Sequence, residues 1–184
     1  MAERRADEIF YHPPPVRVRR TNTISSVETA QKALAFVGSW RQVSVTNLEG
    51  YLKHLGIPWA KRKLAGAFKP ELSFAIIDGV LQVLMPSPIG ERLELLPLHQ
   101  EVIDVDPDGN DFIKTSWWEG STLVTVARAR DKARRTADTI TRRSIRRDDG
   151  ALVQTATNAG ISYERVFHRS STKGTPPITH GKTE

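Results

Sequence analysis

The chain has 184 residues, 39% hydrophobic and 26% charged, which is typical of a soluble, single-domain globular protein. It has no cysteine, which excludes disulfides, thiolate catalysis and cysteine-ligated metal sites. No apolar run is long enough to span a bilayer, and residues 1–8 are too charged for a secretory signal, so we expect a cytoplasmic protein.

The formal net charge of +6 is concentrated in one segment. Between Arg128 and Arg147 there are nine basic residues against Asp131 and Asp138, so this segment carries +7 and the rest of the chain −1. A nucleic-acid-binding module usually adds exposed aromatic residues or a recognition helix among its arginines, and none is interleaved here. The pattern therefore favours a solvated strand pair and loop over nucleic-acid binding.

Both ends of the chain have the composition of extended arms. Residues 1–24 contain Pro13-Pro14-Pro15 and few apolar residues, and residues 170–184 are rich in Ser, Thr, Gly and Pro. The sequence Ser25-Ser26-Val27-Glu28 fits a capping box for a short helix that leads to Phe36. We predict an extended basic arm with a short helix at 1–35, a folded domain at 36–169 and a C-terminal tail at 170–184.

The folded domain opens with a strand and two closely spaced helices. A strand is expected at Ser39–Thr46, followed by a helix that begins after Asn47 as N-cap and ends at Gly56. Pro58 suits the first turn of a second helix, Trp59–Ala67. This helix–turn–helix lacks the side chains of a persuasive DNA reader.

The rest of the domain consists of short alternating segments separated by turn signals such as Asp78-Gly79. The expected strands are Leu72–Ile77, Val80–Met85, Arg92–Leu96, Gln100–Val105, Phe112–Trp117, Thr122–Ala129, Asp138–Arg146, Ala151–Thr157 and Ser162–His168. With Ser39–Thr46 the total is ten, joined mostly by tight turns that make neighbours antiparallel. We predict an all-β, ten-stranded antiparallel up-and-down barrel with a helical lid, with a β-sandwich as the alternative.

Over residues 36–169 the sequence resembles the intracellular fatty-acid-binding protein family, which includes the cellular retinoid-binding proteins. The opening block Phe36-Val-Gly-Ser-Trp-Arg-Gln-Val-Ser-Val-Thr-Asn-Leu-Glu-Gly-Tyr-Leu-Lys-His-Leu-Gly56 is close to the family pattern F-V-G-T-W-x-L-V-S-S-E-N-F-D-x-Y-M-K-x-L-G. Further matches follow in the same order: Ala60–Gly66, Lys69-Pro70, Gln100-Glu101, Glu119–Val124, Leu152-Val153 and Arg165-Val166.

The resemblance implies a ten-stranded clam that holds a fatty acid or similar anionic amphiphile, whose carboxylate is bound by two inward arginines and a tyrosine. Arg165 falls on the arginine of the terminal R-x-Y. The second arginine corresponds to Arg142, or to Arg143 if the register shifts by one residue in this longer hairpin. Phe167 stands where the family has the tyrosine and would lie at the head-group end, while the portal would be lined by Leu48, Tyr51, Leu64 and Ile89.

The residues themselves give the physical basis for these assignments. Arg165 and Phe167 are two apart in a strand and so share a face. A carboxylate drawn into a low-dielectric cavity loses hydration, which bidentate guanidinium hydrogen bonds replace. Phe167 lacks the hydroxyl, which removes one hydrogen bond worth about 0.5–1.5 kcal/mol.

No catalytic or metal site is predicted. The five histidines show no ligand spacing, and Asp104, Asp106, Asp108 and Asp111 are better explained by a turn than by a calcium loop, because Pro107 interrupts them and the terminal Glu is missing. No Gly-x-Ser-x-Gly motif supports nucleophilic catalysis. We therefore expect a protein without enzymatic activity or cofactor.

Two functions are consistent with the sequence. The first is non-catalytic binding of a fatty acid or related amphiphile inside the barrel. The alternative is a structural component of a larger assembly, such as a cytoskeletal or axonemal microtubule lattice of a cilium or flagellum, or an organellar complex. In that case residues 1–35 and the basic Arg128–Arg147 region would contact the protein partner.

Overall fold

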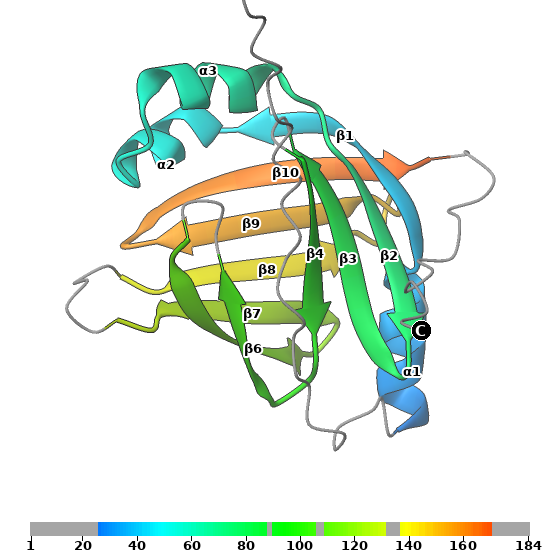
Figure 1. Ribbon diagram of the computed structural model, residues 1–184. Helices are drawn as coiled ribbons and strands as arrows, with labels where there is room; N and C mark the ends of the chain where they lie inside the picture. Colours follow the sequence, from blue (N-terminus) through cyan, green and yellow to red (C-terminus); the bar gives the residue numbers. More distant parts are fainter. Residues whose placement is uncertain (1–25, 88–89, 106–108, 132–136, 171–184) are drawn as a thin grey trace, which may run out of the picture.

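The computed structural model describes residues 26–87, 90–105, 109–131 and 137–170. In this part of the chain it has three helices and ten strands (Figure 1). The helices are α1 (Val27–Phe36), α2 (Leu48–His54) and α3 (Trp59–Ala67). The strands are β1 (Gly38–Thr46), β2 (Glu71–Ile77), β3 (Val80–Ser87), β4 (Gly90–Leu96), β5 (Glu101–Val105), β6 (Asp111–Glu119), β7 (Thr122–Ala129), β8 (Thr139–Ile145), β9 (Leu152–Asn158) and β10 (Ile161–Arg169).

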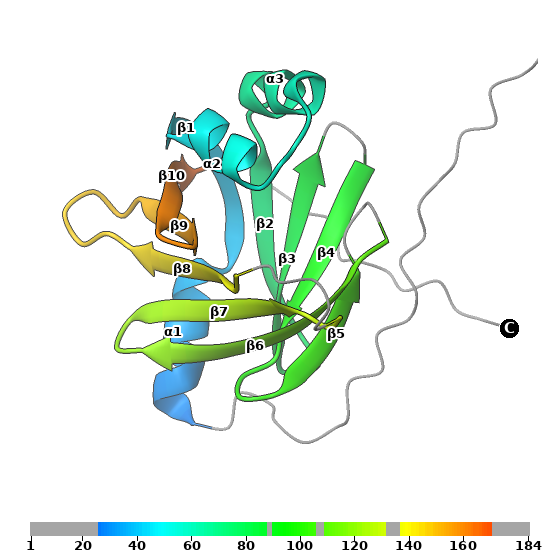
Figure 2. The same ribbon diagram turned by 90° about the vertical axis from the view of Figure 1, so that its left-hand side faces the viewer.

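All ten strands belong to one antiparallel sheet with the order β4-β3-β2-β1-β10-β9-β8-β7-β6-β5. The sheet curls into a nearly closed barrel whose two edge strands are β4 and β5 (Figure 2). The predicted up-and-down barrel is confirmed and the alternative sandwich is wrong, because β1 pairs with β10 and makes the sheet continuous. Strand ends differ from the predicted ones by at most two residues.

Alternation along each strand sorts side chains between the interior and the outer face. In β9 every second residue is buried, namely Leu152, Gln154, Ala156 and Asn158. Trp118 and Trp117 are adjacent on β6 and therefore point to opposite faces. Trp118 packs against the core, while the Nε1 of Trp117 donates to Glu119 at the exposed outer face.

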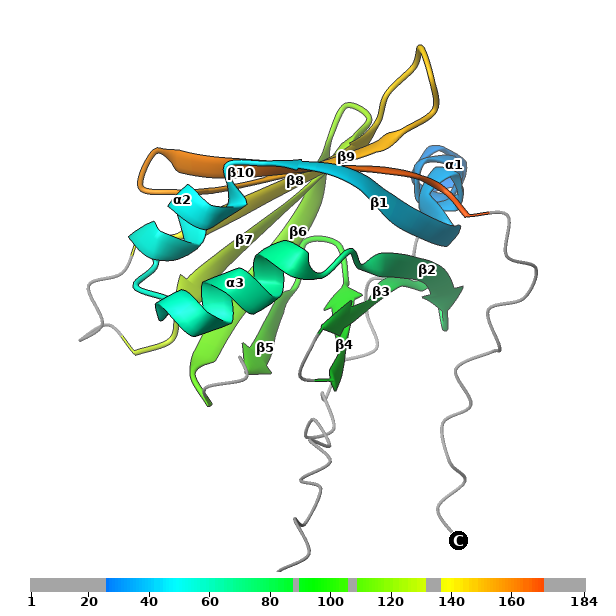
Figure 3. The same ribbon diagram turned by 90° about the horizontal axis from the view of Figure 1, so that it is seen from above.

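Helices α2 and α3 lie together at one end of the barrel (Figure 3). Asn47 has the left-handed φ of 57° and makes no side-chain cap, contrary to its expected role as a capping residue. Its amide instead donates to the carbonyl of Ser162, 2.8 Å away, which ties the start of α2 to β10. Helix α2 is further held by His54, whose Nε2 lies 3.1 Å from Oδ1 of Asn158.

Helix α1 lies at the opposite end of the barrel from α2 and α3 (Figure 1). Its N-cap is Ser26, whose hydroxyl accepts the Thr29 N–H at 3.1 Å. Glu28 lies only two residues after this cap and pairs with Lys32, so the predicted capping box with Glu28 does not form on Ser26. At its C-terminal end the guanidinium of Arg169 donates to the carbonyls of Ala35 and Val37 at 2.6 and 2.8 Å. A cation at a helix C-terminus also interacts favourably with the helix dipole, so the last strand fixes this helix in place.

The hydrophobic core fills the barrel at the α1 end. The Phe36 ring lies 5.7 Å from the Phe74 ring and 5.6 Å from the Trp118 ring, measured between centroids. The buried core cluster consists of Phe36, Trp40, Leu72, Phe74, Leu81, Val83, Leu96, Leu123, Leu152 and Phe167. Side chains from α1 and seven strands thus close this end, and charged groups gather elsewhere in the interior.

Candidate ligand-binding site

The inward face of β10 carries Tyr163, Arg165 and Phe167. Their partners on β9 are Ala156, Gln154 and Leu152, all of which are buried, so the register places these three β10 residues over the interior. The predicted inward direction of Arg165 and Phe167 is therefore confirmed.

The predicted inward direction of Arg142 is wrong, and Arg143 is the inward residue. Arg142 has a side chain 48% exposed and pairs with Glu119 on the outer face, its Nη1 2.5 Å from the carboxylate. Arg143 is 3% exposed and its Nε donates to the buried Gln154 Oε1 at 3.0 Å. Neighbouring residues of a strand point to opposite faces, so the one-residue shift in this longer hairpin exchanges the two arginines.

Arg143 belongs to a chain of alternating charges inside the barrel. Its Nη2 lies 2.7 Å from Oε2 of Glu94, and the other Glu94 oxygen accepts from Lys114 Nζ at 2.8 Å. The same ammonium lies 2.5 Å from Oδ2 of Asp104, which also pairs with Arg92. Three cations and two carboxylates are therefore connected without a break.

This ionic chain (Arg92, Asp104, Lys114, Glu94 and Arg143) crosses the barrel at its open seam. Arg92 and Glu94 lie on β4 and Asp104 on β5, the two edge strands. Side-chain ion pairs thus connect the edges that no ladder of backbone hydrogen bonds joins among the described residues. Lys114 on β6 and Arg143 on β8 extend the connection across the interior.

Glu94 is ionised in the folded protein. Its burial alone would raise the pKa of the carboxyl group, but the charges of Lys114, Arg143 and Arg92 and the hydrogen bond from Lys114 outweigh burial and hold the pKa well below its ordinary value. The carboxylate therefore neutralises part of the interior cationic charge at neutral pH.

Arg165 lies outside the ionic chain. Its side chain is half-buried, and its Nε is fully buried with no hydrogen-bond partner among the described residues. Its guanidinium carbon lies 5.5 Å from the centroid of the Tyr163 ring, within the range of a cation–π contact. Gln154 donates to the Tyr163 hydroxyl at 3.3 Å and accepts from Arg143, so neutral polar groups lie between the two arginines.

The proposed portal residues have different positions. Leu48 and Tyr51 are buried where α2 meets the barrel, and the Tyr51 ring makes an edge contact with Tyr163 at 4.8 Å. Burial raises the pKa of the Tyr51 hydroxyl, against a smaller opposing effect from its hydrogen bond to Thr139. Leu64 is 51% exposed on α3, and Ile89 lies outside the described residues.

Phe167 is part of the hydrophobic core. It is fully buried, and its cross-strand neighbours are Leu152 on β9 and Gln42 on β1. The ring therefore forms the boundary between the apolar end of the barrel and the position of Arg165 two residues earlier. This position has no hydroxyl that could donate to a carboxylate.

Several arginines of the basic Arg128–Arg147 region are paired within the chain. The exposed pairs are Arg128–Glu101, Arg130–Asp111, Arg142–Glu119 and Arg146–Asp149. The hydrogen bond from Arg146 holds the pKa of Asp149 far below its ordinary value. These carboxylates reduce the positive potential on which a contact with an acidic partner was predicted.

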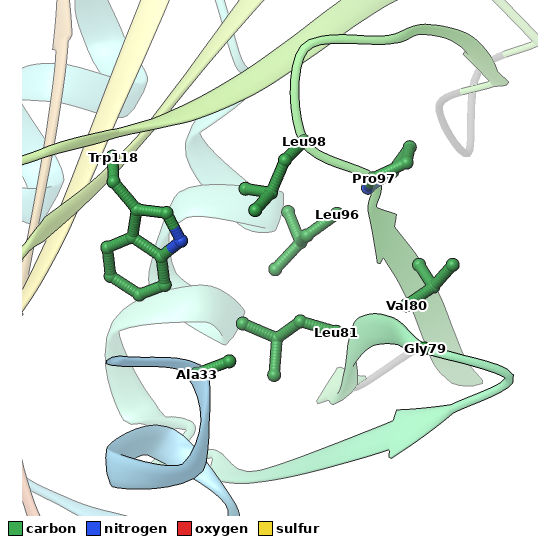
Figure 4. A pocket seen from close by; sticks show the side chains of 8 residues that line it. All are labelled: Ala33, Gly79, Val80, Leu81, Leu96, Pro97, Leu98 and Trp118. Atoms are coloured by element: carbon green, nitrogen blue, oxygen red, sulfur yellow. The ribbon is translucent and has the colours of Figure 1, made fainter. Parts of the chain in front are cut away.

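An apolar pocket lies at the α1 end of the barrel, and Arg165 does not line it. Figure 4 shows Ala33 of α1, Leu81 of β3, Leu96 of β4 and Trp118 of β6 around it.

Within the described ranges, no group of histidine, aspartate and glutamate side chains is arranged to hold a metal ion. Among the same residues, no helix has the length and apolar character needed to cross a membrane.

Sequence comparison finds known proteins that resemble most of this chain. Fatty acid-binding protein 12 of Mus musculus is 30% identical over 133 residues, which cover 72% of this chain and 95% of the relative. The chain belongs to the fatty-acid-binding protein family. The adipocyte fatty acid-binding protein of Pygoscelis papua is 27% identical over 135 residues, covering 73% of this chain and 97% of the relative. No family model matches the sequence.

Solved structures of the family share the fold. Lipid binding protein 8 of Caenorhabditis elegans, in its apo form, has a TM-score of 0.67 at 18% identity and covers 74% of this chain and 96% of its own. The Schistosoma mansoni fatty acid binding protein, solved in complex with arachidonic acid, has a TM-score of 0.66 at 18% identity, covering 76% and 99%. At these identities the likeness shows the fold alone.

Sequence reasoning missed Glu94 and Lys114, the two most buried members of the ionic chain besides Arg143. In Arg92-Leu93-Glu94-Leu95 alternation favours burying the leucines, yet Glu94 is 5% exposed and Leu93 and Leu95 face the other way. The available signal was Leu96, which must be buried with the core and shares its face with Glu94 and Arg92.

Proposed function

We propose that this protein binds a fatty acid or a related anionic amphiphile inside its barrel, without catalysis, and acts as a cytoplasmic carrier. One observation carries the proposal: Arg165 points inward with a buried Nε that has no partner among the described residues. An inward guanidinium of this kind is stabilised by an anion, and a carboxylate accepts two parallel hydrogen bonds from it.

Family membership supports the same function. The mouse and penguin relatives are named as fatty acid-binding proteins, and the Schistosoma mansoni member was solved with arachidonic acid. The inward residues of this chain agree with an amphiphilic ligand, because the cationic Arg165 is followed on the same face by Phe167 and the apolar core. The hydrocarbon tail would contribute about 0.8 kcal/mol per buried methylene.

The head group is assigned to Arg165 and the lid to α2 and α3. Leu48 and Tyr51 would pack against the entering chain, and Leu64 and Ile89 are proposed to lie along its route at the portal. Phe167 would contact the first methylenes rather than the carboxylate. The alternative function, a structural component of a cytoskeletal or organellar assembly, has no support among the described residues.

A titration of delipidated protein with a fluorescent fatty acid tests the proposal. We expect saturable binding to the wild type, and Arg165→Gln should weaken it about 10- to 100-fold, since a hydrogen bond to a charged group contributes about 1.5–3 kcal/mol. Arg142→Gln is the matched control, because this arginine is on the outer face. No saturable binding to the wild type, or equal losses in both variants, would refute the proposal.

A further inference from the structure

Glu94 places a carboxylate of the protein itself against an inward arginine. The Glu94 and Arg143 side chains are 6% and 3% exposed, and the nearest oxygen and nitrogen are 2.7 Å apart. The Arg143 guanidinium also donates to Gln154 and Thr125, at 3.0 and 3.4 Å. All three of its nitrogens therefore donate to groups of the chain.

The charges of the interior are balanced unequally between the two inward arginines. The ionic chain contains Arg92, Lys114 and Arg143 against Asp104 and Glu94, and Arg165 has no carboxylate partner among the described residues. A ligand carboxylate that approached Arg143 would meet the negative charge of Glu94 at the same guanidinium. Like charges in a poorly solvated site repel strongly.

We propose that Glu94 is a specificity-determining residue that occupies Arg143 and directs an anionic head group to Arg165 alone. This inference rests on the proposed function and adds how the site selects its ligand. The ionised carboxylate reduces the preference of the cavity for acids over neutral amphiphiles of the same chain length. Replacing it with a neutral side chain of similar size makes Arg143 available as a second partner.

Three proteins test the proposal: delipidated wild type, Glu94→Gln, and Glu94→Gln combined with Lys114→Met. Glu94→Gln alone leaves one additional uncompensated positive charge in the interior. The double variant removes one negative and one positive charge, so the net interior charge is the same as in the wild type. Circular dichroism establishes that each is folded. Palmitate and hexadecanol are then titrated by displacement of a fluorescent fatty acid, because they share a chain and differ in the charge of the head group.

The ratio of palmitate affinity to hexadecanol affinity is the decisive measurement. We expect Glu94→Gln to raise it about tenfold or more, the effect of one additional charge-assisted hydrogen bond. The double variant should raise it in the same direction, because Arg143 is freed there too. A merely structural role of Glu94 would change both affinities together and leave the ratio constant.

The outcomes separate this proposal from the proposed function. A wild type that binds palmitate, with a ratio that does not increase in either variant that folds, overturns the role of Glu94 and leaves fatty-acid binding intact. A wild type that does not bind palmitate, beside a Glu94→Gln variant that does, supports the role of Glu94 and refutes the proposed function of the native chain. If no protein binds either ligand, both proposals fail.

Discussion

Helix α1 closes one end of the barrel, and Phe36 is the residue whose replacement should show this most directly. Its side chain is 1% exposed and its ring contacts those of Phe74 and Trp118 at centroid distances of 5.7 and 5.6 Å. Replacing a buried phenylalanine with alanine costs about 3–5 kcal/mol, because the lost transfer energy is increased by the cavity left behind. We therefore expect Phe36→Ala to lower the free energy of unfolding by this amount.

The expected shift is large enough to measure by thermal unfolding. For a chain of this size 1 kcal/mol corresponds to about 2–4 °C in Tm, so Phe36→Ala should lower Tm by about 6–20 °C. Urea unfolding followed by circular dichroism gives the free energy independently. Tryptophan fluorescence, to which all four tryptophans including Trp118 contribute, follows the loss of tertiary packing in the same samples.

Leu34→Ala provides a control on the same helix. Leu34 is 58% exposed, so its truncation should change stability by about 0.5 kcal/mol or less. Equal effects of the two substitutions would refute the reasoning, because α1 would then contribute only its intrinsic helicity. A large effect of Phe36→Ala alone shows that the helix is part of the packed core.

Three further substitutions test the interior. Arg143→Met should destabilise the protein by about 3–5 kcal/mol, because Glu94 loses a buried partner. The same substitution at the exposed Arg142 should cost about 1 kcal/mol or less. Urea unfolding measures both costs, and equal values would contradict the assignment of Arg143 to the interior. Because the pKa of Glu94 is lower in the folded than in the unfolded state, its contribution to stability is complete above the ordinary pKa of a glutamate and decreases as the pH falls below it. The loss of stability between about pH 5 and pH 3 should therefore be smaller in Glu94→Gln than in the wild type. An identical dependence of stability on pH in the two proteins would refute this. Gln42 is 6% exposed and its Oε1 has no hydrogen-bond partner among the described residues, so Gln42→Leu should stabilise the protein by about 1 kcal/mol, and a lower Tm in this variant would contradict the expectation.

The strand pattern was accessible from the sequence because its signals are local. The Asp78-Gly79 pair lies at the turn between β2 and β3, where both residues have positive φ. Ser26 is the N-cap of α1, so the serines at 25 and 26 marked the start of this helix even though the box with Glu28 does not form on Ser26. Tight turns determine antiparallel pairing of successive strands, so the meander could be predicted without knowledge of tertiary contacts, whereas the pairing of β1 with β10 that excludes a sandwich is itself a tertiary contact.

The choice between Arg142 and Arg143 could not be made in the same way. Alternation shows that they face opposite sides but not which of them is inside, and the longer connection before β8 removes the turn as a reference point. The structure decides it through the register with β9, where Arg143 lies opposite the buried Gln154.

The sequence by itself determined the ten strands, the lid and the inward position of Arg165, since these follow from periodicity, turn residues and an ordered series of matches. Only the tertiary structure showed that Glu94 pairs with Arg143, 49 positions away, and that Lys114 and Asp104 continue the chain of charges. The physical reason is that burial of a charge depends on partners which the curled sheet brings together across the barrel. Alternation alone predicts that a glutamate between two leucines is exposed to solvent.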